Sequence, residues 1–272
     1  MTGTRAAAID WHVMERGSGR PLLLLHGFTG SGASWAEQLG PFAERRRVIT
    51  PDLPGHGGTP AAPHEAMTIE ATARALARLL ADLGASPADV VGYSLGARIA
   101  LQLAMDHPAS VARLVLESPS AGIAGAAARS ERRAADEALA ARLERDGIEG
   151  FVSAWERTPV FATHAALAPK LVERQRAIRL ASDPHGLAAS LRAAGQGSMP
   201  PLHGRLAEVT APTLVIAGEL DTVAGTRAGE VAAGIPGARL ERLAGIGHTP
   251  HLEAPDAFAR LTLDFLEERS SA

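Results

Sequence analysis

Short runs of apolar residues alternate along the chain with stretches whose apolar residues recur every three to four positions. An unbroken apolar run indicates a strand buried on both faces, and the longer spacing indicates a helix with one buried face. The predicted strands lie at 21–25, 47–50, 89–91, 111–116, 212–218 and 239–243. The predicted helices lie at 69–83, 95–105 and 255–267. This alternation predicts an α/β protein with a mostly parallel, doubly wound sheet.

The pattern changes between Gly122 and Arg205, where the chain is rich in alanine, leucine, arginine and glutamate and shows little strand signal. Helical spacing is broken there at Gly147, Pro159, Pro184 and 195–197. We therefore expect residues 122–205 to form a helical cap over the carboxyl edge of the sheet. Residues 1–121 and 206–272 are expected to form the core that carries it.

Composition narrows the class of protein. A chain of 272 residues with 46% hydrophobic residues suffices for one large domain, or for a domain with an insertion. It has no cysteine, which excludes disulfides, thiolate catalysis and cysteine-ligated metals. Its net charge of −3 gives no electrostatic reason to expect nucleic acid or an anionic membrane as a partner.

Hydropathy also bears on localisation. Residues 1–13 include the polar residues Arg5, Asp10 and His12 and no long apolar run, so they do not resemble a signal peptide. No stretch of about 18 apolar residues is present, so we expect no transmembrane helix. Together these features predict a cytoplasmic protein.

Gly92-Tyr93-Ser94-Leu95-Gly96 lies between a predicted strand and a predicted helix. A serine on such a tight turn presents its hydroxyl at the edge of the sheet, and the flanking glycines let other backbone segments pass close by. The pattern G-x-S-x-G is weak evidence by itself, but this context predicts that Ser94 is a catalytic residue.

Two further residues complete a candidate catalytic triad. A serine hydroxyl needs an imidazole to take its proton and a carboxylate to orient that imidazole. Asp221 and His248 each follow a predicted strand, and the order Ser94, Asp221, His248 is that of the α/β-hydrolase arrangement. Glu117, which also ends a strand, is an alternative acid, and His251 is an alternative base.

An oxyanion hole needs two backbone N–H groups aimed at one point. We expect one from Leu95, directly after the serine, and one from Phe28, in the loop that follows the strand at 21–25. The chain has no H-E-x-x-H spacing. We therefore expect neither a metal ion nor a cofactor.

These motifs resemble the α/β-hydrolase superfamily over nearly the whole chain. A narrower resemblance is to the 2-succinyl-6-hydroxy-2,4-cyclohexadiene-1-carboxylate (SHCHC) synthases of menaquinone biosynthesis. The residues that carry it are 25–31 with Trp35, 92–98, 117–122, Arg132-Arg133 with Asp136-Glu137, Trp155 with 159–161, Arg179, and 186–188 with 190–192. The chain departs from that family at 195–199 and at His203, where the family often has tryptophan.

The resemblance implies a lyase on a hydrolase scaffold, which eliminates pyruvate from a substrate with several carboxylates. It implies that Arg98, Arg132 and Arg179 bind those carboxylates and that Tyr93 and Trp155 line the pocket. Arg98 lies one helical turn after Ser94, and arginine suits planar, bidentate recognition of carboxylates. The partner expected is therefore a small polycarboxylate.

Two other functions remain open from the sequence. One is a carboxylic-ester or carbon–carbon hydrolase that forms an acyl-enzyme on Ser94. The other is a binding protein that kept the fold and lost the chemistry. The second is disfavoured because no member of the candidate triad is missing.

Overall fold

The computed structural model describes residues 9–268, except the side chains of residues 223 and 224. Arg5 and the outer ends of the predicted core ranges lie outside these residues. Within them, seven strands form one sheet in the order β1-β3-β2-β4-β5-β6-β7. Their bounds are β1 Val13–Arg16, β2 Arg20–Leu25, β3 Arg46–Pro51, β4 Ala88–Tyr93, β5 Val111–Glu117, β6 Thr213–Gly218 and β7 Arg239–Leu243.

Every pairing in this sheet is parallel except that of β1 with β3, which is antiparallel. Six of the strands were predicted, and the mostly parallel sheet is confirmed. β1 was not predicted, because a four-residue strand with three exposed residues carries no continuous apolar run.

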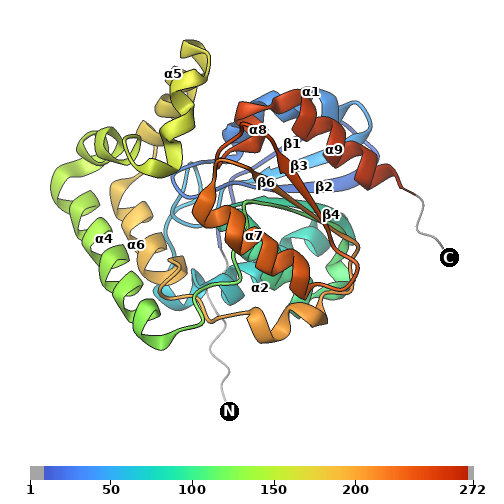
Figure 1. The fold of residues 1–272 in the computed structure, drawn as a ribbon, viewed down its shortest axis with the longest axis horizontal. Helices are drawn as coiled ribbons and strands as arrows, with labels where there is room; N and C mark the ends of the chain where they lie inside the picture. Colours follow the sequence, from blue (N-terminus) through green and yellow to red (C-terminus); the bar gives the residue numbers. More distant parts are fainter. Residues whose placement is uncertain (1–8, 269–272) are drawn as a thin grey trace.

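Helices cover both faces of the sheet (Figure 1). Along β2, Leu22 and Leu24 pack with α1 and α9, whereas Leu23 and Leu25 pack with α2 and α3. Successive side chains of a strand point to opposite faces, so four consecutive leucines serve two cores. The helix bounds are α1 Ala36–Ala43, α2 Ile69–Asp82, α3 Leu95–Asp106, α7 Thr222–Gly234, α8 Pro250–Glu253 and α9 Pro255–Glu267.

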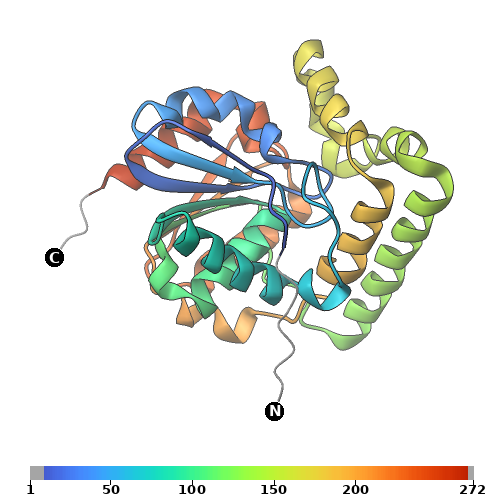
Figure 2. The ribbon, with the colours of Figure 1, turned by 180° about the vertical axis from the view of Figure 1, so that it is seen from behind.

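Residues 118–212 contain no strand. Their α-helices are α4 Ala126–Trp155, α5 Pro169–Leu180 and α6 Pro184–Ala194. These helices lie together beyond one edge of the sheet, as Figure 1 and the reverse view in Figure 2 both show. The predicted break at Gly147 is a kink within α4, where this residue has φ 69° and ψ −178°.

The segment of α4 to α6 has its own small core. Leu143 and Phe151 of α4 pack there with Leu187 and Leu191 of α6, and Phe28 from the sheet side packs against the same cluster. The aromatic ring of Phe28 thereby links this segment to the loop after β2. The domain bounds 122–205, 1–121 and 206–272 stay a prediction.

No helix of residues 9–268 is long and apolar enough to span a membrane.

Candidate active site

Ser94 lies on the turn between β4 and α3, with φ 51° and ψ −104°. A non-glycine residue in this region costs on the order of 1–3 kcal/mol, so the surrounding structure must enforce it. Its backbone N–H donates to the carbonyl of Glu117 at 2.9 Å, and its own carbonyl accepts from the N–H of Arg98 at 3.1 Å. These bonds fix the strained turn to β5 on one side and to α3 on the other.

The two glycines of the motif are required by close backbone approaches. A Cβ on Gly96 would lie 2.1 Å from the carbonyl oxygen of Leu25, and a Cβ on Gly92 would lie 2.5 Å from that of Gly96. Both distances are far below van der Waals contact. The glycines thus let β2, β4 and α3 meet beneath the serine.

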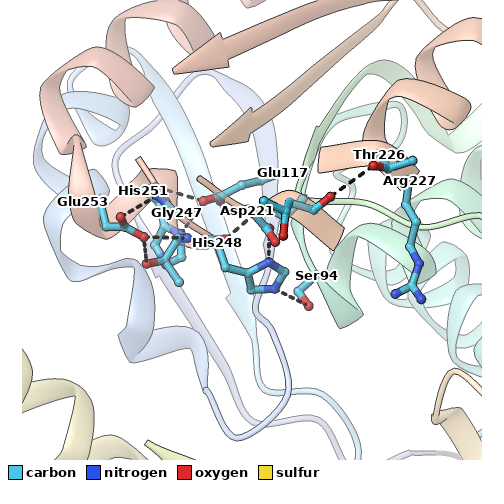
Figure 3. Close-up of polar contacts among 12 residues, drawn as sticks. Ser94, Glu117, Asp221, Thr226, Arg227, Gly247, His248, His251 and Glu253 are labelled. Carbon is cyan, nitrogen blue, oxygen red and sulfur yellow. Dashed lines mark hydrogen bonds and ion pairs between the residues drawn. The ribbon is translucent and has the colours of Figure 1, made fainter. Parts of the chain in front are cut away.

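His248 joins Ser94 to Asp221 (Figure 3). Its Nε2 lies 3.3 Å from the Oγ of Ser94, and its Nδ1 lies 2.5 Å from Oδ2 of Asp221. The three residues come from the loops after β4, β6 and β7. Parallel pairing places the carboxyl ends of these strands at one edge of the sheet, which brings the loops together.

The loop that carries His248 is held by hydrogen bonds on both sides of the imidazole. The hydroxyl of Ser118 donates to the backbone carbonyl of His248 at 3.0 Å. The carboxylate of Glu253 accepts from the N–H of Gly247 at 2.7 Å and from that of Thr249 at 3.0 Å. Burial acts to raise the pKa of Glu253, but these hydrogen bonds outweigh it and the pKa is lowered. The charged carboxylate therefore anchors this loop.

The alternative acid and the alternative base pair with each other. Oε1 of Glu117 accepts from the backbone N–H of His251 at 2.9 Å and lies 2.7 Å from its Nδ1. Both side chains are almost fully buried, at 0% and 2% exposure. This geometry favours Asp221 over Glu117 as the partner of His248, and gives Glu117 and His251 a supporting position beneath the loop.

The two residues predicted to donate to an oxyanion, Phe28 and Leu95, line the same cavity as Ser94. Leu95 is the first residue of α3, and the N–H groups of a first helical turn have no intrahelical acceptor. Phe28 lies in the loop after β2. The Phe28 ring makes edge contacts with the rings of His56, Phe151 and Trp155. These contacts hold the loop that carries its N–H.

A cavity of about 360 Å³ is lined in part by Ser94, Asp221 and His248, the three residues of the candidate triad. This volume is in the usual range for sites that bind small molecules. The structure brings nine of the ten predicted site residues to its wall: Phe28, Tyr93, Ser94, Leu95, Arg98, Arg132, Trp155, Asp221 and His248. Hydrophobic and aromatic side chains such as Leu139 and Phe161 line much of the rest.

Arg98 is 7% exposed and has no carboxylate partner among the described residues. Its Nη1 donates to the carbonyl of Ala194 at 2.7 Å. Burial, together with the nearby charge of Arg132, lowers the pKa of Arg98 to about 10. A buried guanidinium still carries its charge at neutral pH, so this residue gives the cavity wall a positive charge that protein carboxylates leave largely uncompensated.

Arg179, which the resemblance implies to be a carboxylate-binding residue, is not among the residues that line the main cavity. It lines a second cavity of about 30 Å³, together with Tyr93, Gln175 and His251. Its Nη1 donates to Glu156 at 3.1 Å, and its guanidinium lies 5.0 Å from the centroid of the Phe161 ring. Helix α5 turns this side chain toward α4 and the back of Tyr93.

Arg227 and Gln196 line the main cavity and were not predicted as site residues. Arg227 lies on α7, after the loop of Asp221, and Gln196 follows α6. Neither belongs to a motif with a known mechanism, so the sequence alone holds no signal for Arg227 beyond its distance of six positions from Asp221. Gln196 falls within the stretch where the chain departs from the resemblance.

Two buried histidines support the loop of Phe28. Nε2 of His26 accepts from the N–H of Leu53 at 2.9 Å, and the rings of His26 and His56 lie 5.2 Å apart. Burial lowers the pKa of both residues, that of His56 to about 3.

A third histidine, the half-buried His164, contacts Thr249 in the loop of His248. Burial and the charge of Arg179 lower the pKa of His164 to about 4. All three histidines are therefore neutral in the folded protein at pH 7.

Acidification should destabilise the protein through these histidines. Their pKa values are lower in the folded than in the unfolded chain. Their contribution to the free energy of unfolding is therefore fully present above pH 6.5 and is lost as pH falls. For each histidine, the free energy of unfolding falls by about 1.4 kcal/mol per unit decrease in pH, from pH 6.5 down to the pKa of that histidine in the folded protein. Urea unfolding at pH 7.5, 6.5, 5.5 and 4.5 should show this decline, and His56→Gln should make it shallower. His185→Gln, at an exposed position, is the control. Equal declines in wild type and His56→Gln would contradict the prediction.

Comparison with known proteins places the chain among related sequences. A family model described as "alpha/beta hydrolase fold" matches residues 20–255. A Bacillus subtilis (strain 168) protein named "Putative 2-succinyl-6-hydroxy-2,4-cyclohexadiene-1-carboxylate synthase" is 38% identical over 247 residues, which make up 90% of this chain and 89% of that protein. The magnesium-chelatase 30 kDa subunit of Rhodobacter capsulatus is 32% identical over 270 residues, 97% of this chain and 93% of that one. Among solved structures, MenH from S. aureus has a TM-score of 0.89 and 35% identity, covering 94% of this chain and 97% of its own.

Proposed function

The chain belongs to the α/β-hydrolase fold family, and on that premise we propose that it is a carbon–oxygen lyase of menaquinone biosynthesis. The substrate proposed is 2-succinyl-5-enolpyruvyl-6-hydroxy-3-cyclohexene-1-carboxylate. The enzyme eliminates pyruvate from it to give 2-succinyl-6-hydroxy-2,4-cyclohexadiene-1-carboxylate, which is the product in the names of its relatives.

One observation carries the proposal. The hydrogen-bonded series Ser94–His248–Asp221 and the buried Arg98, which has no carboxylate partner in residues 9–268, face the same cavity. An ester with an apolar acyl group offers no charge that would offset a buried cation in the cavity wall. A substrate with several carboxylates offsets that charge. We propose further that α4 and α6, as parts of a cap of residues 122–205, close this cavity over the sheet.

The first step is the removal of a proton from the ring carbon that bears the succinyl group. Ser94 passes its own proton to Nε2 of His248 and takes the substrate proton on Oγ. Asp221 stabilises the resulting imidazolium through Nδ1, as in other serine–histidine–aspartate sites. The proton moves along the 3.3 Å contact between Oγ of Ser94 and Nε2 of His248, whereas the 2.5 Å contact between Nδ1 and Asp221 orients the imidazole and stabilises its charge.

The electrons of the broken C–H bond pass first to the succinyl carbonyl, whose oxygen becomes negative. The N–H groups of Phe28 and Leu95 stabilise this oxyanion, and such donors lower barriers by several kcal/mol. The electrons then shift through the ring alkene, and the C–O bond to the enolpyruvyl group breaks. The imidazolium of His248 gives its proton to the departing oxygen, which returns the histidine to its neutral form and releases enolpyruvate. Enolpyruvate tautomerises to pyruvate, and the ring keeps two conjugated double bonds.

A pyruvate assay tests the proposal directly. Purified protein should release one pyruvate per substrate molecule, measured by coupling to lactate dehydrogenase and following the oxidation of NADH. The diene product gives a second, independent signal in the ultraviolet. Absence of pyruvate from the authentic precursor, with folded protein at micromolar concentration, would refute the lyase function.

A hydrolase is the second candidate, because the same triad geometry serves acyl transfer. In that case an activated ester should give a burst of product equal to the enzyme concentration, with Ser94 acylated. The lyase proposal expects no burst with p-nitrophenyl esters, since Ser94 acts as a base and forms no covalent bond. Intact-mass spectrometry after mixing separates the two mechanisms.

A further inference from the structure

Arg227 reaches the main cavity from the sheet side of the molecule. It lies on α7, and in Figure 3 its side chain extends beyond Ser94 as seen from His248. The side chain is half-buried and lines the cavity together with Arg98 and Arg132. The cavity is therefore walled by three arginines from three different helices, α3, α4 and α7.

Gln196 connects two of these arginines. Its Oε1 accepts from Nη1 of Arg227 at 3.0 Å and lies 3.5 Å from Nη1 of Arg132. Two guanidinium groups thus meet at one neutral amide oxygen. An amide oxygen can accept both hydrogen bonds, but it cannot neutralise either charge.

Carboxylates form an ion pair with only one of the three arginines in residues 9–268. Asp136 binds Nε of Arg132 at 2.7 Å, and no ion pair of Arg98 or Arg227 occurs in residues 9–268. Burial lowers the pKa of Arg227, the charge of Arg132 lowers it further, and Glu230 and Asp221 act in the opposite direction. Like charges in a partly desolvated wall repel, so an anion bound between them is favoured.

We infer that Arg227, Gln196 and Arg132 form a carboxylate subsite, separate from Arg98, that binds one carboxylate group of the substrate. This deepens the proposed function and rests on it. The proposed substrate carries three carboxylates, on its ring, its succinyl arm and its enolpyruvyl arm. A planar carboxylate between Arg227 and Arg132 takes the place of the Gln196 oxygen, and a rotation of the amide lets its Nε2 donate to the same carboxylate.

The position of the subsite suits one end of a branched anion. Arg132 belongs to α4 and Gln196 follows α6, whereas Arg227 belongs to α7 beside the sheet. A carboxylate held there bridges these elements and fixes the substrate through a group that takes no part in the proton transfer. Its effect should therefore fall mainly on binding, and on KM more than on kcat.

Binding of tricarballylate, a flexible tricarboxylate, tests the subsite without catalysis. Isothermal titration calorimetry should show that Arg227→Gln binds it at least tenfold more weakly than wild type, as expected for the loss of one charged hydrogen-bonded contact. Gln196→Glu, which supplies an internal carboxylate to both arginines, should weaken binding to a similar extent. Arg142→Gln, with the same charge change on α4 at a residue that pairs with Asp146, should bind like wild type.

Kinetics separate this inference from the proposed function. With the enolpyruvyl substrate, Arg227→Gln should raise KM at least tenfold and change kcat less than threefold, and Arg227→Lys should recover part of the loss. Wild-type affinity and wild-type KM in both Arg227→Gln and Gln196→Glu would overturn the subsite while the lyase function stood. A wild-type protein that binds tricarballylate through Arg227 but releases no pyruvate would overturn the function and leave the subsite. Failure of wild type to bind tricarballylate would count against the subsite.

Discussion

Replacing His248 by alanine should lower kcat for pyruvate release at least a thousandfold. His248 contacts both Ser94 and Asp221, and its imidazole is the proposed proton acceptor for the serine hydroxyl, which its loss removes. General-base catalysis contributes about 10²–10⁴ to a rate, and triad members that act as one unit contribute more. Ser94→Ala should have an effect of the same order, because either change breaks the same proton route.

The measurement is kcat by the coupled pyruvate assay at saturating substrate. His185→Ala is the matched control, since it removes a histidine that is exposed on α6 and should retain wild-type kcat. The thermal unfolding midpoint of each variant shows whether the fold is kept. More than a tenth of the wild-type rate in a folded His248→Ala protein would contradict the assignment of His248 as the base.

Chain order and strand ends were enough to predict the residues that meet at the candidate triad. Parallel strands leave their carboxyl ends at one edge, so residues directly after β4, β6 and β7 must converge there whatever the rest of the chain does. The choice between Asp221 and Glu117 is open from the sequence, because Asp221 follows a strand and Glu117 ends one. Only side-chain geometry separates them, and it pairs Glu117 with His251.

The directions of the side chains on α4, α5 and α7 could not be predicted in this way. The sequence marks Arg179 as one of many arginines on a helix, but its side-chain direction depends on how α5 packs, and Glu156 and the Phe161 ring hold it away from the main cavity. The reverse holds for Arg227, which lines the main cavity although the sequence did not indicate it. It is an isolated cation in α7 without a motif, and only the fold shows that it meets Arg132 at Gln196.

A serine–histidine–aspartate site can serve elimination as well as hydrolysis, because both reactions develop a negative oxygen next to the serine. The N–H groups proposed as oxyanion donors, those of Phe28 and Leu95, would suit either oxyanion, so the candidate triad and these donors do not by themselves select the reaction. Selection comes from what holds the rest of the substrate. After the candidate triad, the positive charge of the cavity wall is therefore the feature whose removal should lower kcat/KM for pyruvate release most.

Arg98→Ala should reduce kcat/KM for pyruvate release by at least thirtyfold. Truncating one member of a buried, hydrogen-bonded charge pair costs about 2–5 kcal/mol, because the remaining charge is left desolvated and unpaired. In the complex that remaining charge would be a carboxylate of the substrate. Arg98→Met, which keeps most of the side-chain volume, should show the same loss, whereas Arg142→Ala, on the solvent side of α4, should not.

The thermal midpoint must accompany these values, because Arg98 also donates to the carbonyl of Ala194 at the end of α6. If the loss of activity came only from that structural bond, Arg98→Met would unfold earlier and would lose activity in proportion to its folded fraction. An anion-binding role predicts a different result: a fully folded Arg98→Met protein with a raised KM and with weaker inhibition by tricarballylate. A folded Arg98→Met protein with wild-type kcat/KM would show that this charge does not bind the substrate. Pyruvate release would then be the observation that distinguishes a lyase from an esterase.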